Sequence, residues 1–388
     1  MERNALLLLI VASLLCAVAG CKPFPQNKPA PPSQNKPEPP PDVDRIRAAI
    51  AVEVERLIDL QNEDGSWKAE GAGEDGYPVG RTALATLALQ QGWKYLPKET
   101  ADLGAKARES SRKGLAFIIQ QWPEPKTYSA GLVEQMLFKA GARGYGKQIS
   151  MYGWMLCRSQ TVYGPQAGAY TYDLFGFPKD FETKKSYEPS KSMLSGRADN
   201  SNALFAALGL YYSERSGFQV PKLIWWRLRK YYTNAQHPDG SWDYLSDAYR
   251  NVNGTDVASD LPALPAASNR SMTFAGTLGL SLANETLTAE SHEECKPRPA
   301  SEPVERGLAW IAKNFNHGAS LQPYGWYACE RLGTLTGYSE FGGVDWYQAG
   351  SSALCKQIED GTIKDVPDLA FSLLFLSSGP TRVDFNKP

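Results

Sequence analysis

The sequence has almost no net charge, few histidines and no cysteines at zinc-binding spacing. Its 41 Lys and Arg residues nearly balance 42 Asp and Glu residues, and the formal net charge is −1. Because the basic residues are scattered, the electrostatic footprint of a nucleic-acid-binding protein is missing. Three histidines and six cysteines, without any C-x-x-C spacing, give no pattern typical of a zinc site. We therefore expect no nucleic-acid partner, no metal and no cofactor.

Long apolar runs are also scarce, and the one clear example lies at the N-terminus. Residues 5–19 are apolar, follow Arg3 and are too few to span a bilayer comfortably. At the end of this run, Val18-Ala19-Gly20-Cys21 resembles a bacterial lipobox, in which the cysteine becomes the lipidated N-terminus. This predicts a lipoprotein signal peptide over residues 1–20 and attachment to a membrane through Cys21. An ordinary secretory signal with an incidental cysteine is the alternative.

A proline-rich segment follows Cys21. Residues 21–42 combine proline with Gln, Asn, Lys and Ser, a composition that favours extended polyproline II and cannot form a core. We interpret it as a spacer that leads to a domain over residues 43–380 and a tail over residues 381–388. A proline-rich recognition ligand is the alternative. The expected location is the bacterial cell envelope, exported and lipid-anchored on a periplasmic or surface face.

A short motif occurs twice, as Gln61-Asn62-Glu63-Asp64-Gly65-Ser66-Trp67 and as Gln236-His237-Pro238-Asp239-Gly240-Ser241-Trp242. Each copy lies between a helix-like apolar run and a run rich in Ala and Leu. Asp-Gly permits the positive φ of a tight turn, and Trp offers a large face for packing on a neighbouring unit. We interpret the motif as a structural turn that clamps repeats together, through Gln61, Asp64, Gly65, Trp67, Gln236, Asp239, Gly240 and Trp242.

The repeats predict six helix pairs. The second helix of each pair is apolar nearly all round, as a buried inner helix requires, whereas the first carries more charge and suits an outer ring. The expected pairs are residues 46–61 with 81–90, 110–121 with 128–140, 148–160 with 200–213, 222–236 with 270–283, 303–315 with 324–335, and 346–357 with 367–377.

The repeated turn resembles the QW motif of the squalene-cyclase and protein-prenyltransferase superfamily, over about residues 46–378. The resemblance implies an all-α fold, an α6/α6 toroid of helix–turn–helix repeats, with a ligand site in the central cavity or at one mouth. The motifs that carry the superfamily's known activities are nevertheless absent from the sequence: D-x-D-D, D-D-x-x-D, the zinc-binding Asp, Cys and His cluster, and G-C-G-E-Q.

Polar residues near the starts of the inner helices are the remaining site candidates. Tyr324, Tyr327 and Arg331 share one face of a helix, whereas Trp326 and Glu330 share another. An aromatic, carboxylate and arginine lining would suit a sugar, a peptide or an amphipathic lipid; packing with a buried Glu–Arg pair is the alternative. The candidate cavity residues are Asp199, Asn200, Arg270, His317, Tyr324, Tyr327, Glu330 and Arg331, of which Asp199 also reads as a helix N-cap.

Four cysteines follow Cys21, namely Cys157, Cys295, Cys329 and Cys355. Export permits disulfides, but the sequence indicates no pairing, and we expect buried thiols. Residues 243–269 form a long insertion between predicted helices, which makes them a candidate lid or partner surface.

An intact repeat framework without any known catalytic motif predicts a non-catalytic module that binds a small apolar, glycan or peptide ligand, or a protein partner. The first alternative is an enzyme that uses the toroid cavity. It would be either a polysaccharide lyase-like protein, with His317, Tyr324, Tyr327 and Arg331 in its site, or a divergent terpenoid cyclase. The second is a structural envelope protein, which predicts a filled, apolar centre instead of an open cavity.

Overall fold

The computed structural model describes residues 41–68, 77–164, 166–178, 197–245, 266–288, 301–316 and 321–379. Over these ranges the chain forms twelve α-helices, three short 3-10 helices and one small β-hairpin. The predicted all-α fold is confirmed. Cys21, Cys295, His317, the Pro-rich segment up to residue 40, residues 246–265 of the insertion and the tail lie outside the described residues.

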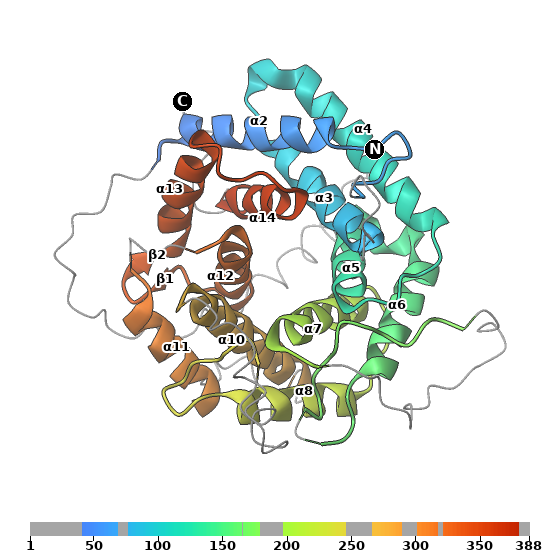
Figure 1. Cartoon of the computed structure of the whole chain (residues 1–388), viewed down its shortest axis with the longest axis vertical. Helices are drawn as coiled ribbons and strands as arrows, with labels where there is room; N and C mark the ends of the chain where they lie inside the picture. Colours follow the sequence, from blue (N-terminus) through green and yellow to red (C-terminus); the bar gives the residue numbers. More distant parts are fainter. Residues whose placement is uncertain are drawn as a thin grey trace, which may run out of the picture.

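The twelve α-helices form two concentric rings (Figure 1). The outer ring comprises α2 (Val43–Asp59), α4 (Ala101–Gln120), α6 (Gly146–Ser159), α8 (Lys222–Ala235), α11 (Glu302–Asn314) and α13 (Trp346–Glu359). The inner ring comprises α3 (Pro78–Gly92), α5 (Thr127–Gly141), α7 (Asn200–Arg215), α10 (Ala266–Thr288), α12 (Pro323–Thr336) and α14 (Val366–Leu376). The 3-10 helices are η1 (Trp93–Tyr95), η2 (Lys98–Thr100) and η3 (Ala142–Gly144), and the hairpin pairs β1 (Glu340–Phe341) with β2 (Val344–Asp345).

The inner ring is closed. Neighbouring inner helices contact one another in the order α3, α5, α7, α10, α12 and α14, and α14 contacts α3. The first and last helix pairs also meet on the outside, where the guanidinium of Arg45 in α2 donates to both carboxylate oxygens of Glu359 in α13, at 2.7 and 2.8 Å. The chain therefore folds as the expected α6/α6 toroid.

The inner helices are buried nearly all round and the outer helices on one face, as the sequence predicts. In α3 the buried positions run almost continuously from Val79 to Leu89, whereas α11 buries one stripe of Val304, Gly307 and Ile311. One outer helix is longer than expected: α4 begins at Ala101, nine residues before the predicted start. Its buried face consists mainly of Gly, Ala and Ser, so the apolar periodicity that signals a helix is missing from this segment.

The first repeated turn holds α2 and α3 against the next outer helix, α4. Gln61 Nε2 donates to the carbonyl oxygens of Gly65 and Ser110, both at 2.9 Å, and its Oε1 accepts from the Ser110 hydroxyl at 2.7 Å. Asp64 Oδ1 accepts from the backbone N–H of Ser66 at 3.0 Å. The indole N–H of buried Trp67 donates to the Leu57 carbonyl at 2.7 Å.

The second repeated turn makes equivalent contacts with α11, although its glutamine Oε1 accepts from Arg306 rather than from a serine. Gln236 Nε2 donates to the carbonyl oxygens of Gly240 and Pro303, at 3.0 and 2.8 Å. The indole N–H of Trp242 donates to the Tyr232 carbonyl at 3.0 Å. The two copies thus perform one structural task at two positions of the ring.

A third copy, which the sequence pattern missed, follows α6. Gln160 Nε2 donates to the carbonyl oxygens of Gly168 and Ile224, at 3.2 and 3.0 Å. Gly168 has φ +101°, and buried Tyr170 follows it at the place of the tryptophan. This copy does not match the sequence motif, because Gln160 and Gly168 are farther apart and Tyr170 replaces the tryptophan.

Across the described ranges, no helix has both the length and the apolar character that crossing a bilayer requires.

Candidate functional site

Aromatic side chains from three inner helices, α7, α12 and α14, meet inside the ring. Phe205 in α7 stacks on Tyr327 in α12, with ring centroids 6.3 Å apart and an interplanar angle of 10°. Phe371 in α14 lies 4.9 Å from Tyr327 and 6.4 Å from Phe205, and Tyr324 lies 5.8 Å from Phe371. We call these four residues the central aromatic cluster.

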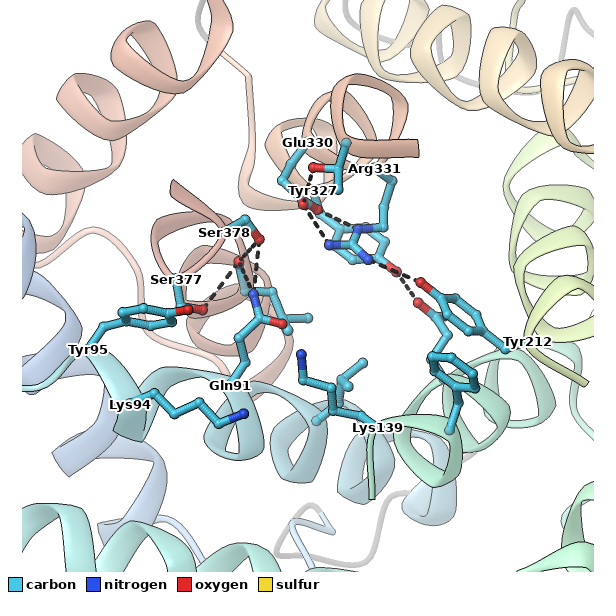
Figure 2. A pocket seen from close by; sticks show the side chains of 15 residues that line it. Gln91, Lys94, Tyr95, Lys139, Tyr212, Tyr327, Glu330, Arg331, Ser377 and Ser378 are labelled. Atoms are coloured by element: carbon cyan, nitrogen blue, oxygen red, sulfur yellow. Dashed lines mark hydrogen bonds and ion pairs between the residues drawn. The ribbon is translucent and has the colours of Figure 1, made fainter. Parts of the chain in front are cut away.

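A pocket of about 290 Å³ lies above this cluster, at one mouth of the ring (Figure 2). Its lining comes mainly from the C-terminal halves of α3, α5, α12 and α14, from the two serines that follow α14, from Tyr212 near the end of α7, and from η1. Tyr327 contributes to both the cluster and the pocket, because its hydroxyl reaches Gln135 Oε1 in α5 at 2.7 Å. We call this hollow the mouth pocket.

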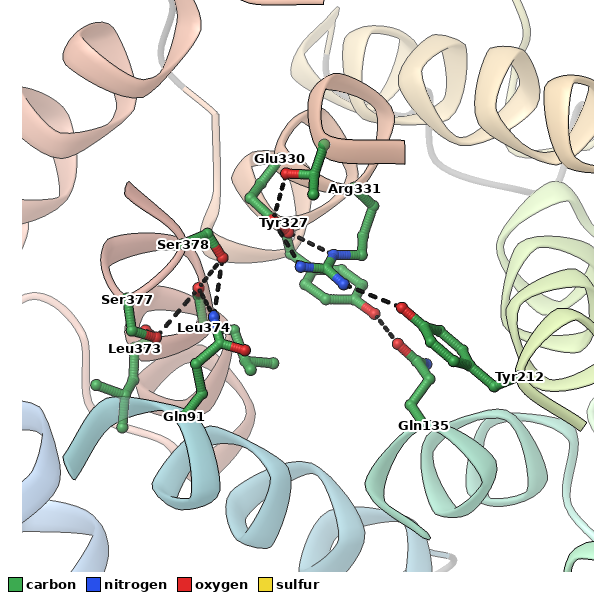
Figure 3. Close-up of polar contacts among 11 residues, drawn as sticks. Gln91, Gln135, Tyr212, Tyr327, Glu330, Arg331, Leu373, Leu374, Ser377 and Ser378 are labelled. Atoms are coloured by element: carbon green, nitrogen blue, oxygen red, sulfur yellow. Dashed lines mark hydrogen bonds and ion pairs between the residues drawn. The ribbon is translucent and has the colours of Figure 1, made fainter. Parts of the chain in front are cut away.

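Glu330 and Arg331 form a fixed ion pair on one wall (Figure 3). Arg331 Nη2 donates to Glu330 Oε1 at 2.6 Å, Arg331 Nε donates to Glu330 Oε2, and the Thr334 hydroxyl donates to Oε1 at 2.9 Å. The remaining nitrogen, Nη1, donates to the Tyr212 hydroxyl at 3.3 Å, and the guanidinium lies 5.7 Å from the centre of the Tyr327 ring. Glu330 is fully buried, so both predicted residues reach the pocket as one neutralised pair.

Two lysines give the pocket its unneutralised charge. Lys94 in η1 and Lys139 in α5 are exposed, and their side chains point into the pocket (Figure 2). Neither amino group has an ion-pair partner in the part of the chain that the structure describes. Although much of the side chain is exposed, partial burial of its amino group lowers the pKa of Lys139, and repulsion from Lys94 and Arg331 lowers it further. Such an arrangement favours an arriving negative charge.

The other predicted residues lie near the starts of the inner helices, away from the mouth pocket. Asp199 caps α7: its Oδ1 accepts from the Asn202 N–H at 2.7 Å and its Oδ2 from Asn202 Nδ2 at 2.8 Å. Asn200 Nδ2 donates to the Asp243 carbonyl at 2.5 Å. Arg270 is half-buried in the second turn of α10. Burial raises the pKa of Asp199, although hydrogen bonds from Asn202 oppose the shift.

Two of the predicted site residues, Tyr324 and Arg331, lie toward opposite ends of α12. The Tyr324 hydroxyl accepts from Ser201 Oγ at 3.1 Å, near the start of α7. Arg331 follows Tyr324 by seven residues, about 10 Å along the helix axis, and reaches Tyr212 near the end of α7. A lyase site needs its tyrosine base and arginine around one sugar unit. The structure therefore does not bring Tyr324 and Arg331 together as that alternative requires.

Sequence reasoning missed the two lysines, Gln91, Gln135 and Tyr212, which complete the mouth pocket. These residues occur in no motif. Most of them lie in or just after the C-terminal halves of inner helices, whereas several predicted residues lie near the helix starts. The sequence feature that could have indicated them is a lysine or tyrosine near the end of an otherwise apolar helix, such as Lys139 in α5 and Tyr212 in α7.

The described ranges hold three of the four cysteines that follow Cys21. No group of three or more His, Cys, Asp and Glu side chains there is placed to hold a metal ion. Cys157, Cys329 and Cys355 are buried thiols, and burial raises the pKa of all three, to about 12 for Cys355.

No protein-family model and no curated protein matches the chain. Among solved structures, it is similar to type II terpene cyclase MstE from Scytonema in complex with its product, merosterolic acid A, at 12% identity and a TM-score of 0.47, over 87% of this chain and 96% of that chain. The ligand-free cyclase gives 13% identity and 0.46, over 82% and 80%. Protein geranylgeranyltransferase-I from Candida albicans gives 12% and 0.44, over 88% and 91%. The likeness concerns the fold alone.

Proposed function

We propose that this protein binds a small ligand in the mouth pocket without transforming it. The observation that carries the proposal is a hollow of about 290 Å³ in which the carboxylate of Glu330 and the hydroxyl of Tyr327 are already engaged with protein partners. Ligand pockets in proteins begin at roughly 300 Å³. A small apolar molecule, a glycan fragment or the end of a peptide is a ligand of suitable size.

The state of the ionisable groups supports binding rather than catalysis. General acid–base chemistry needs a side chain that is free to exchange a proton with the substrate. Glu330, the one carboxylate among the described lining residues, accepts from Arg331 through both oxygens (Figure 3). The Tyr327 hydroxyl donates to Gln135, and burial raises the pKa of Tyr327. The Tyr327 hydroxyl therefore keeps its proton near neutral pH, and both oxygens of Glu330 are occupied by Arg331.

Native mass spectrometry of the full chain, purified from its host and then denatured, tests this function. We expect the wild-type protein to release a small molecule that Thr334→Phe does not retain. Thr334 is an exposed lining residue, so a ring at this position would occupy the pocket. The change also removes the hydrogen bond from Thr334 to Glu330 Oε1, so urea denaturation must first show that the variant is folded.

The matched control is Thr233→Phe, on the exposed side of the outer helix α8. It introduces the same ring far from the pocket and should leave the released molecule unchanged. A ligand that persists in Thr334→Phe would place the site elsewhere. Conversion of the ligand into a product by the purified protein would contradict a non-catalytic role.

We also propose that Cys21 anchors the protein in a bacterial envelope membrane. The support is the lipobox-like Val18-Ala19-Gly20-Cys21 and the Pro-rich segment after it. A labelled fatty acid fed to the host should be incorporated into the wild-type protein and into Cys16→Ser, but not into Cys21→Ser. Label that remains in Cys21→Ser would rule out this anchor.

A second candidate function, an enzyme, is favoured by Asp199 near the starts of the inner helices. This carboxyl is buried with a raised pKa, and Tyr128, Tyr172 and Tyr244 surround it. A protonated carboxyl there would be a proton donor of the kind that a divergent terpenoid cyclase needs. Asp199→Asn separates the roles, because Asn also caps helices well. Loss of a measured turnover in a folded Asn variant would support the enzyme, whereas unchanged behaviour leaves Asp199 as a cap.

A further inference from the structure

The mouth pocket carries more positive than negative charge. Lys94, Lys139 and Arg331 contribute three positive charges and Glu330 one negative charge, which leaves a net +2 among the charged lining residues. Glu330 neutralises Arg331 through two hydrogen bonds. The surplus therefore resides on the amino groups of the two lysines, which lack an ion-pair partner in the described part of the chain.

We propose that the mouth pocket binds a small organic carboxylate, with its anionic group between Lys94 and Lys139. Its organic part would lie against Phe138 and Tyr212, whose rings are 5.0 Å apart on the wall of the pocket. This inference rests on the proposed binding function and adds the class of ligand.

The backbone around the pocket favours a carboxylate over a phosphate. Phosphate sites typically use helix N-termini, where free N–H groups and the helix dipole attract a doubly charged anion. The mouth pocket is built at the C-terminal ends of inner helices, such as Gln91 in α3 and Leu374 and Ser378 at the end of α14. Helix C-termini carry partial negative charge. The partial negative charge of these carbonyl groups offsets part of the positive charge of Lys94 and Lys139. The site therefore favours a ligand with one negative charge over a ligand with two.

A simpler role for the lysines is to complement the helix dipoles, since Lys139 lies in the last turn of α5 and Lys94 directly follows α3. That role explains the charge of these residues but not their direction. Both side chains turn over the pocket (Figure 2), where Lys94 lowers the pKa of Lys139 by repulsion. A lysine that only complements a dipole would be better hydrated if it pointed outward.

Differential acetylation of lysines in the full, lipidated chain in lipid nanodiscs tests the inference. A limiting amount of acetic anhydride is added, and mass spectrometry measures the labelled fraction of Lys94, Lys139 and Lys147. Lys147 is an exposed residue of the outer helix α6 and serves as the internal reference. The probes are benzoate, phenylbutyrate and octanoate, each paired with its neutral primary amide, together with inorganic phosphate.

We expect at least one carboxylate to protect Lys139 and Lys94 from acetylation, while its amide and phosphate at the same concentration do not. Lys94→Gln should raise the carboxylate concentration for half-protection of Lys139 by about tenfold, because one charge-assisted hydrogen bond is lost. Lys147→Gln should leave it unchanged.

Three results would overturn the inference. Equal protection by a carboxylate and its amide would mean that the pocket does not distinguish a charged ligand from a neutral one. The proposed binding function would then still stand. Stronger protection by phosphate would replace the carboxylate with a different anion. No protection by any carboxylate would remove the anion site, and the molecule released from wild-type protein but not from Thr334→Phe would then decide the binding function by itself.

Discussion

The hydroxyl of Tyr327 donates a hydrogen bond to Gln135 Oε1 at 2.7 Å and thereby joins α12 to α5 across the centre of the ring. These helices are opposite one another, since α7 and α10 lie between them on one side and α14 and α3 on the other. Side chains therefore connect opposite helices inside the ring, and both Tyr327 and Gln135 also line the mouth pocket. A long chain threaded through the ring would have to displace these side chains.

Tyr327→Phe tests the strength of this connection. The variant keeps the ring but leaves Gln135 Oε1 buried without its donor, so we expect the free energy of unfolding to fall by about 1–2 kcal/mol. Urea denaturation measures the change. Tyr163→Phe, at an exposed tyrosine, is the matched control and should have no measurable effect. Equal stability of both variants would show that the bond across the ring contributes nothing.

Gly65→Ala should cost more stability than Gly361→Ala. Both glycines have positive φ, of +86° and +65°. A Cβ on Gly65 would stand 2.6 Å from the Lys113 carbonyl oxygen, whereas one on Gly361 would meet open space. We expect about 1 kcal/mol for Gly361→Ala from backbone strain and about 2–4 kcal/mol for Gly65→Ala. Thermal unfolding measures both losses of stability. Equal losses would mean that the close approach of Gly65 to the Lys113 carbonyl in α4 does not limit the side chain at this position.

Glu330→Gln should destabilise the protein strongly. The change leaves Arg331, with a side chain 14% exposed, without its carboxylate. Removing one partner of a buried ion pair typically costs about 3–5 kcal/mol. Adding Arg331→Met should restore part of the loss, because no unpaired charge then remains buried. Glu109→Gln, which breaks the exposed pair with Arg112, should scarcely change the denaturation midpoint.

Glu53→Gln should stabilise the protein at alkaline pH. Glu53 in α2 is fully buried, and burial raises its pKa from 4.5 to about 8 despite Arg56. The folded protein therefore keeps a proton that the unfolded chain releases, and stability falls as the pH rises from 4.5 to about 8. The Gln variant cannot ionise, so its advantage should be absent near pH 4 and reach about 2–5 kcal/mol above pH 8.

The control for this prediction is Glu55→Gln, on the exposed side of the same helix. It removes one carboxylate without removing a buried group and should show no such dependence on pH. A difference between wild type and Glu53→Gln that stays constant from pH 4 to 9 would mean that Glu53 does not hold a proton in the folded state.

Much of the fold could be read from local chemistry. Both copies of the Q-x-x-D-G-S-W turn contain what their contacts need, since Gly65 and Gly240 adopt positive φ and the tryptophans donate to carbonyls ten residues earlier. The all-round apolar character of the inner helices predicted their ring. The prediction was wrong at the start of α4, where the buried residues are small and give no apolar periodicity. It also missed the third turn, in which Gln160 and Gly168 are farther apart in sequence than the Gln and Gly of the other two copies.

The sequence by itself determined the helix pairs, their inner and outer roles and the turns between them, because each depends on residues within one repeat. Only the tertiary structure decided the site. The mouth pocket joins Lys94, Lys139, Tyr212 and Arg331, residues far apart along the chain. The tertiary structure also separated Asp199 and Tyr324 from Arg331. Ring closure brings the ends of distant helices together, and the direction in which each side chain points depends on helix rotation, which no local pattern specifies.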